Sequence, residues 1–102
     1  MGQMKTIYIA GPISGRKYWI AYFSFLRTEI MLWFLGYNPV NPMKKIPVHW
    51  DYYTQVSFGC CLAAKSDFIY LKRNWRKSKG ARKELRSFLY NHSINNVIWF
   101  IK

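Results

Sequence analysis

The fold is decided by the stretch Thr6-Ile7-Tyr8-Ile9-Ala10-Gly11-Pro12, which joins a short strand to an abrupt turn. The five residues before the glycine have the β-type, largely apolar character of a strand buried on both faces, as in a parallel sheet. Gly11 and Pro12 form a turn signal that ends the strand. We therefore predict a buried first strand whose carboxyl end opens into a loop over residues 11–17.

The rest of the chain alternates between helical and strand-like patterns, with a loop expected over 43–48. The expected elements are a helix over about 18–35 ended by Gly36, an edge strand within 37–42, a helix from Asp51 to about Ala64, a strand over 67–71, a helix over 79–91 capped by Ser78, and a strand over 96–101. Such a series predicts a parallel sheet with right-handed crossovers. We expect a single α/β domain over residues 1–102, a flavodoxin- or Rossmann-like three-layer sandwich with four mainly parallel strands.

Composition restricts the function without naming it. The chain has 102 residues, 51% of them apolar and 20% aromatic, which suits one packed core and excludes disorder. Its formal net charge of +12 attracts anionic partners from a distance. Nucleotide phosphates, nucleic acid and acidic membranes all satisfy that condition, so charge alone does not choose among them.

The most apolar part of the chain is the helix expected over 18–35. A bilayer span is disfavoured because Arg27, Thr28 and Glu29 would lie at its centre. Two apolar stripes run along it, one through Ile20, Phe23, Arg27, Ile30 and Phe34, the other through Tyr22, Phe25, Glu29, Leu32 and Trp33. One stripe would pack on the sheet. The other favours a homodimer.

The cysteines and the N-terminal residues indicate in which cellular compartment the protein is expected. Cys60 and Cys61 are adjacent, so we expect buried free thiols in a reducing environment. No signal-peptide pattern opens the chain, because residues 5–6 already begin a strand. The expected location is the cytoplasm, or a host cytoplasm if the chain is encoded by a phage. No cysteine or histidine spacing predicts a metal site, and no cofactor is expected.

The most reactive stretch is Ser78-Lys79-Gly80-Ala81-Arg82-Lys83-Glu84, which sets one of only four carboxylates in a strongly basic run. In parallel α/β folds, ligands bind beyond the carboxyl ends of the strands, where this stretch is expected. A helix N-terminus with free amides favours an anion. We therefore expect a phosphate-binding site here, with Glu84 as its reactive carboxylate.

Four motifs give the chain a family resemblance. They are Tyr8-Ile9-Ala10-Gly11-Pro12-Ile13-Ser14-Gly15, Gly36-Tyr37-Asn38-Pro39-Val40-Asn41-Pro42, Ser66-Asp67-Phe68-Ile69-Tyr70-Leu71, and the signature from Asn74 to Glu84. In this order they resemble the nucleoside 2-deoxyribosyltransferase superfamily, in particular its small bacterial and phage branch. The chain also resembles the 2′-deoxynucleoside 5′-phosphate N-hydrolases. The likeness covers nearly the whole chain.

The resemblance implies a two-step transfer of deoxyribose. Glu84 would attack C1′ of the sugar while the base departs, and Tyr8 would hold the carboxylate. Water or a second base would then resolve the covalent sugar ester. The residues expected to hold phosphate or sugar are Gly11, Ser14, Gly15, Arg16, Ser78, Gly80 and Ala81.

One departure from the family pattern concerns the acid that protonates the leaving base. Relatives place an aspartate eight residues before the position of Asp67, where this chain has Gly59. General acid help is worth about 10²–10⁴ in rate. His49 or Asp51 could supply the proton from the preceding loop. Trp50 and Trp75 lie on loops where they could stack on a base.

Each of these residues also has an ordinary structural interpretation. Glu84 could be a solvated helix residue paired with its basic neighbours, and the run 72–86 a solvated face. Tyr8 could be a core tyrosine, and Asp51 a helix cap.

Three functions therefore remain open. The first is an N-glycosidase or deoxyribosyltransferase acting on a 2′-deoxynucleoside 5′-monophosphate. The second, motivated by Gly59, is a nucleotide-binding protein without turnover, of the kind that a phage could use to sequester a nucleotide. The third is a nucleic-acid-binding module, suggested by the net charge alone.

Overall fold

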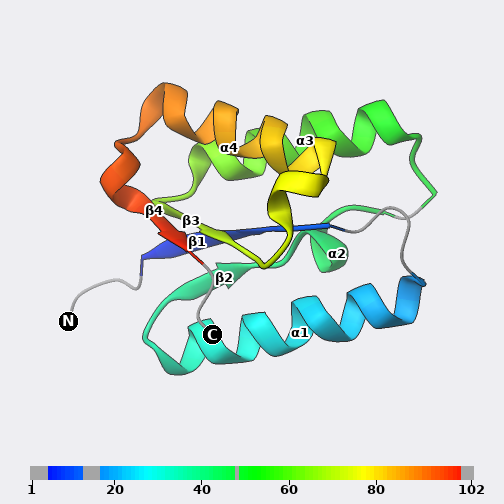
Figure 1. Ribbon diagram of the computed structural model, residues 1–102, viewed down its shortest axis with the longest axis horizontal. Helices are drawn as coiled ribbons and strands as arrows, with labels where there is room; N and C mark the ends of the chain where they lie inside the picture. Colours follow the sequence, from blue (N-terminus) through cyan, green and yellow to red (C-terminus); the bar gives the residue numbers. More distant parts are fainter. Residues whose placement is uncertain (1–4, 13–16, 48, 100–102) are drawn as a thin grey trace.

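The computed structural model describes residues 5–12, 17–47 and 49–99, and shows one four-stranded sheet (Figure 1). The strands are β1 (Thr6–Ala10), β2 (Asn38–Val40), β3 (Phe68–Leu71) and β4 (Val97–Trp99). Their order is β2-β1-β3-β4, and every neighbouring pair is parallel. The predicted parallel sheet is confirmed, and so is the placement of the proline-containing strand β2 at an edge.

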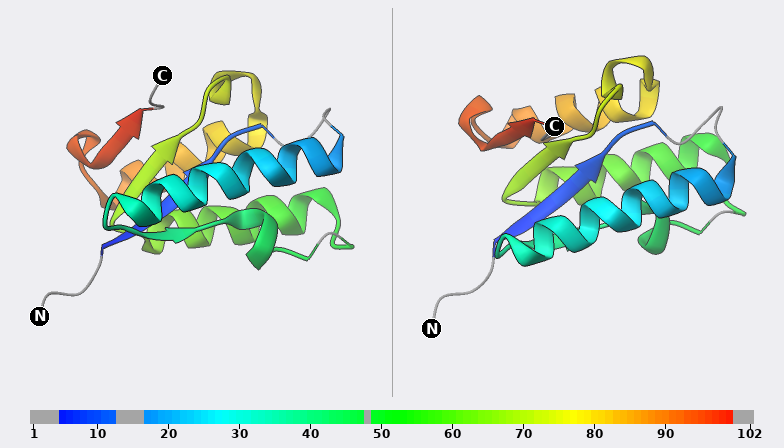
Figure 2. Two further views of the ribbon diagram at one scale, coloured as in Figure 1. Left: turned by 90° about the horizontal axis from the view of Figure 1, so that it is seen from below. Right: turned by 60° about the horizontal axis from the view of Figure 1, so that its bottom comes forward.

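Helices cover both faces of the sheet, which makes the three layers that the sequence predicts (Figures 1 and 2). On one face lie α1 (Tyr18–Phe34) and the short α2 (Pro42–Lys45). On the other lie α3 (Tyr52–Lys65) and α4 (Lys79–Asn91), which pack against each other. Two 3-10 turns, η1 (Trp75–Lys77) and η2 (Ile94–Asn96), precede α4 and β4. The fold is a Rossmann-like parallel α/β sandwich.

Strand β1 distributes its side chains between two cores. Because successive residues of a strand point to opposite faces, Ile7 and Ile9 pack with Phe25 and Leu32 on the α1 side. Tyr8 belongs to the core on the α3 and α4 side. This alternation directs the Tyr8 side chain toward the two helices that build the site described below.

Most predicted boundaries hold, and the differences are local. Residues 43–48 were expected to form a loop, but Asn41 starts α2 by accepting a hydrogen bond from the Met43 amide, and Pro42 occupies the first turn. The last strand begins only at Val97, because the residues before it form η2. Gly36 follows α1 with a φ of 96°, the left-handed conformation of a helix C-terminus.

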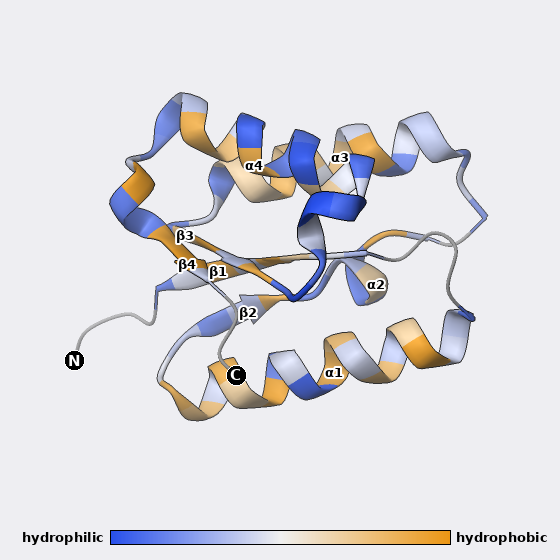
Figure 3. Ribbon diagram, viewed as in Figure 1, coloured by the Kyte–Doolittle hydropathy of each residue, from blue (hydrophilic) through white to orange (hydrophobic). Residues whose placement is uncertain are grey.

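Helix α1 leaves an apolar stripe uncovered (Figure 3). The large apolar side chains exposed along it are Tyr18, Trp19, Ile20, Phe23, Ile30, Trp33 and Phe34. Of the two predicted stripes, the one through Phe25 and Leu32 packs on the sheet as expected, although its last member, Trp33, is 59% exposed. In the part of the chain that the structure describes, no helix is long and apolar enough to cross a bilayer.

The cysteines differ from expectation in their burial. Both are free thiols, as predicted, but Cys60 is half-buried and Cys61 is exposed. They lie on adjacent positions of α3, so their side chains project about 100° apart around the helix. The prediction that both thiols are buried is wrong.

Candidate functional site

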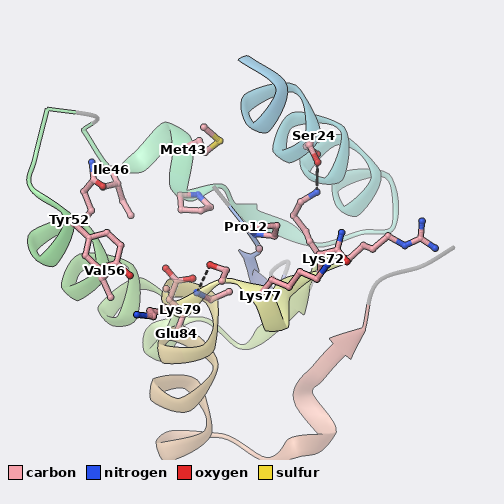
Figure 4. A pocket seen from close by; sticks show the side chains of 18 of the residues that line it. Pro12, Ser24, Met43, Ile46, Tyr52, Val56, Lys72, Lys77, Lys79 and Glu84 are labelled. Atoms are coloured by element: carbon pink, nitrogen blue, oxygen red, sulfur yellow. Dashed lines mark hydrogen bonds between the residues drawn. The ribbon is translucent and has the colours of Figure 1, made fainter. Parts of the chain in front are cut away.

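A cavity of about 950 Å³ opens at the carboxyl edge of the sheet (Figure 4). Its walls come from the turn after β1, the first half of α1, helix α2, the start of α3, and the segment from η1 into α4. Lys72, Arg73, Lys77 and Lys79 line it, together with a single carboxylate, Glu84. This is the edge at which parallel α/β folds bind ligands.

Glu84 is held in place by the tyrosine at the centre of β1. The Tyr8 hydroxyl donates a hydrogen bond of 2.7 Å to Glu84 Oε2. Helix α4 carries Glu84 in its second turn, and the fully buried Tyr8 reaches it from the sheet below. The interpretation of Glu84 as a solvated surface residue is therefore wrong. Tyr8 is a core tyrosine and also orients the carboxyl group.

Burial changes the acidity of both partners. Removal from water raises the pKa of Glu84 from an ordinary 4.5 to about 8, although the hydrogen bond from Tyr8 opposes the rise. Burial also raises the pKa of Tyr8 well above its ordinary value, and the adjacent Glu84 carboxylate adds to the effect. At neutral pH the tyrosine keeps its proton, and most Glu84 side chains are protonated.

Gly59 lies directly against this pair, at the position where the resembling families have an aspartate. A Cβ atom at residue 59 would lie 2.3 Å from Glu84 Oε2 and 3.0 Å from the Tyr8 hydroxyl. No side chain fits there while Glu84 keeps its present position. Gly59 therefore has a structural effect besides the absence of an aspartate: it allows the Glu84 carboxyl group to lie against the backbone of α3.

The basic wall of the cavity has one buried member, Lys72. Its side chain is 8% exposed, and its Nζ donates to Ser24 Oγ at 2.8 Å and Thr28 Oγ1 at 3.0 Å on α1. A Cβ at Gly11 would come within 2.8 Å of the Lys72 Cβ, so the stem of the lysine passes directly over the glycine. Lys72 thus fixes the distance between α1 and the edge of the sheet.

The opposite wall is the start of α4. Ser78 caps the helix by accepting a 3.2 Å hydrogen bond from the Ala81 amide, as the sequence predicts. The amides of Lys79 and Gly80 lie in the first turn, where a helix has no carbonyl partners of its own. With Lys77 and Lys79 on either side, this end of the cavity favours an anion.

The other three carboxylates have structural partners. Glu29 accepts from Asn41 and forms an ion pair of 3.1 Å with Lys44. Asp51 accepts a short hydrogen bond from the Thr54 hydroxyl at the start of α3. Asp67 accepts from Thr6 at the amino edge of the sheet. Glu84 is thus the one carboxylate of four that faces the cavity.

Some of the predicted site residues lie together at the main cavity, and others do not. Gly11, Ser78, Gly80, Ala81 and Glu84 line the cavity, and Tyr8 lies beneath it. The described lining does not include His49, Trp50 or Asp51: Asp51 occupies the N-cap position of α3, and Trp50 packs edge-on against Phe58. Trp75 borders a second cavity. The predicted residues Ser14, Gly15 and Arg16 lie outside the described part of the chain.

Sequence reasoning missed the role of Lys72, which it placed in a basic run with no special position. The available signal was its location directly after the buried strand 68–71, where a side chain still faces the interior. Arg73, Lys77 and Lys79, from the same basic run, do reach the cavity. The run is therefore not simply a solvated face.

The fold and the site together define a small Rossmann-like protein with a basic cavity and one half-buried carboxyl group in its lining. Residues 5–94 match the family described as a domain of unknown function, DUF4406. The match spans most of the chain, so the chain belongs to this family. Searches of curated proteins and of solved structures give no significant match.

Proposed function

We propose that the protein cleaves the N-glycosidic bond of a 2′-deoxynucleoside 5′-monophosphate and passes the sugar to water or to a second base. Glu84 is the nucleophile at C1′, and Tyr8 orients it through the 2.7 Å hydrogen bond. The carboxylate forms an ester with C1′ as the C1′–N bond breaks, and the departing base takes a proton from water. Attack by water or a second base on C1′ then frees Glu84.

One observation carries the proposal: Glu84 is oriented by a buried tyrosine at a cavity whose other charged lining residues are all cations. A strongly shifted pKa in a cleft is typical of catalytic carboxyl groups. The basic wall and the α4 N-terminus suit the 5′-phosphate of the substrate. Only the ionised carboxylate attacks carbon, so turnover should increase as the pH approaches and passes about 8.

The test is release of free base, followed by chromatography, from each of the common deoxynucleosides and its 5′-monophosphate. The wild type should act on at least one monophosphate, and Glu84→Ala should lower the rate by about 10³-fold or more. Glu84→Gln should lose turnover and still bind. Asp67→Asn is the matched control, because it makes the same acid-to-amide change on a carboxylate at the opposite edge of the sheet, outside the cavity.

A second function, nucleotide binding without turnover, is supported by Gly59. No aspartate stands beside the leaving group, and Glu84 occupies the space that its side chain would need. Under this alternative, a nucleotide raises the melting temperature of the wild type, yet no base appears on prolonged incubation. Base release that disappears in Glu84→Ala would exclude it.

We further propose that a second copy of the chain covers the exposed stripe of α1. The basic residues of η1 and α4 lie on the far side of the sheet, so two copies can meet through α1 without bringing those charges together (Figure 3). Light scattering should show a dimer for the wild type and a monomer for Phe23→Glu. Tyr53→Glu, on the exposed surface of α3, should remain a dimer. A monomeric wild type would contradict this arrangement.

A further inference from the structure

A second cavity, of about 490 Å³, lies beside η1 and differs in chemistry from the first. It is lined by Arg73, Asn74, Trp75, Arg76, Lys77 and Trp99. Two tryptophans and three cations therefore line an open hollow, and its described lining contains no carboxylate. Aromatic faces beside positive charge are what a nucleobase and its phosphate require.

The tryptophans come from distant parts of the chain and meet at this cavity. The rings of Trp75, in η1, and Trp99, at the end of β4, have centroids 5.8 Å apart and planes 51° apart. The Arg76 guanidinium lies 5.5 Å from the centroid of the Trp75 ring. Trp99 is 48% exposed, which leaves much of its surface available to a ligand.

The two cavities share a wall. Arg73, Asn74 and Lys77 line both the main cavity and the tryptophan-lined one. Asn74 adopts a left-handed conformation with a φ of 68°, which asparagine tolerates better than most residues. This conformation lets the chain turn into η1 right after β3, so that η1 stands between the two cavities.

We propose that the tryptophan-lined cavity binds a second nucleobase, and that the ligand is a nucleotide whose sugar in the main cavity is joined through phosphate to another nucleoside. The linking phosphate would lie at the shared wall, near Arg73 and Lys77. The second base would stack on Trp99 and Trp75. This inference rests on the proposed function for the identity of the first nucleotide, but the second cavity can be tested by itself.

Two ligands share this chemistry, and they differ in the phosphate link. A 3′–5′ phosphodiester would join the nucleosides in a fragment of single-stranded nucleic acid. A 5′–5′ pyrophosphate would join them in a free dinucleotide. Both place a second base beyond a phosphate, so the same tryptophan contact serves both.

Calorimetric titration can test the proposal with three probes that share adenine as their base. They are 2′-deoxyadenosine 5′-monophosphate, the 5′-phosphorylated 3′–5′ dinucleotide of deoxyadenosine, and di(2′-deoxyadenosine-5′) diphosphate. We expect at least one of the two-base probes to bind wild-type protein about 10-fold or more tightly than the monophosphate, because stacking one base has an effect of that size. Trp99→Ala should remove this gain and leave binding of the monophosphate unchanged, and Trp99→Phe should restore much of it.

The matched control is Tyr90→Ala, which removes an exposed aromatic side chain that lines neither cavity and lies outside the exposed stripe of α1. Repeating the titrations with Glu84→Gln prevents turnover from consuming the probe. Equal affinity for one-base and two-base probes, or a two-base affinity that Trp99→Ala leaves unchanged, would overturn the proposal. If two-base probes bind through Trp99 while no base is ever released, the second subsite stands and the proposed hydrolysis fails.

Discussion

Asp67 and Glu84 are both carboxylic acids held by hydrogen bonds, yet they lie at opposite edges of one sheet and their acidities shift in opposite directions. At the amino edge, Asp67 Oδ2 accepts from the Thr6 amide and hydroxyl at 3.0 and 3.1 Å. The backbone hydrogen bond from Thr6 is the largest reason why the pKa of Asp67 is lowered. At the carboxyl edge, burial raises the pKa of Glu84 to about 8.

The difference shows that the balance between hydrogen bonding and loss of water sets the acidity of a carboxyl group: hydrogen bonds from Thr6 prevail at Asp67, and burial prevails at Glu84. Asp67 stays in contact with water and is ionised at neutral pH, which suits a group that ties β1 to β3. Glu84 is enclosed by Tyr8 and Gly59, so ionisation costs free energy until something changes its surroundings. The environment of Asp67 is typical of a carboxylate that stabilises a fold, and the environment of Glu84 is typical of a catalytic carboxyl group.

The largest expected effect is on the pH dependence of stability. The pKa of Glu84 is raised in the folded state from 4.5 to about 8. The favourable contribution of the protonated side chain to the free energy of unfolding is therefore complete below pH 4.5 and is lost as the pH rises to about 8. Each pKa unit corresponds to about 1.4 kcal/mol, so the full loss is on the order of 5 kcal/mol. The glutamine in Glu84→Gln does not titrate. The free energy of unfolding of this variant, measured with urea, should therefore rise relative to that of the wild type between pH 5 and 9. If the free energies of unfolding of the two proteins change with pH in parallel, the pKa of Glu84 is not raised in the folded protein.

A smaller effect should follow from Gly59→Ala. The new Cβ would displace the flexible Glu84 carboxyl group toward the cavity and weaken its bond with Tyr8. Contact with water and with the cationic wall should then lower the pKa of Glu84 toward its ordinary value. The carboxyl carbon signal in an NMR titration reports this directly.

Gly80→Ala serves as the control for Gly59→Ala. Both glycines lie in helices, but a Cβ at residue 80 meets only Val56 and Ser78, at 3.8 and 3.9 Å. Its effect on the Glu84 titration should be negligible. If both variants leave that titration unchanged, Gly59 does not set the environment of Glu84.

The smallest expected effect belongs to Asp67→Asn. Loss of the charged acceptor for Thr6 should destabilise the fold by about 1 kcal/mol at pH 7. Because the pKa of Asp67 is lowered, its contribution to stability is present above the ordinary pKa of the group and is lost as the pH falls through the lowered pKa, so variant and wild type should converge in acid. Base release should not change, since Asp67 lies at the edge opposite the cavity. A loss of turnover without a loss of stability would contradict this separation.

Much of this arrangement follows from local sequence. The apolar run of β1, the turn at Gly11-Pro12 and the cap at Ser78 predict strand, turn and helix, because each depends on neighbouring residues alone. The meeting of Tyr8 with Glu84 was suggested only by family resemblance. No local pattern shows that Lys72 turns inward or that η1 divides two cavities.

The succession of strands and helices along the chain, and the placing of one carboxylate in a strongly basic stretch, follow from the sequence alone, because periodicity, charge and turn residues act over a few positions. The shifted acidity of Glu84 was decided only by the tertiary structure. Its cause is the packing of α3 against α4, which brings the backbone at Gly59 against a carboxyl group 25 positions later and reduces the contact of that group with water.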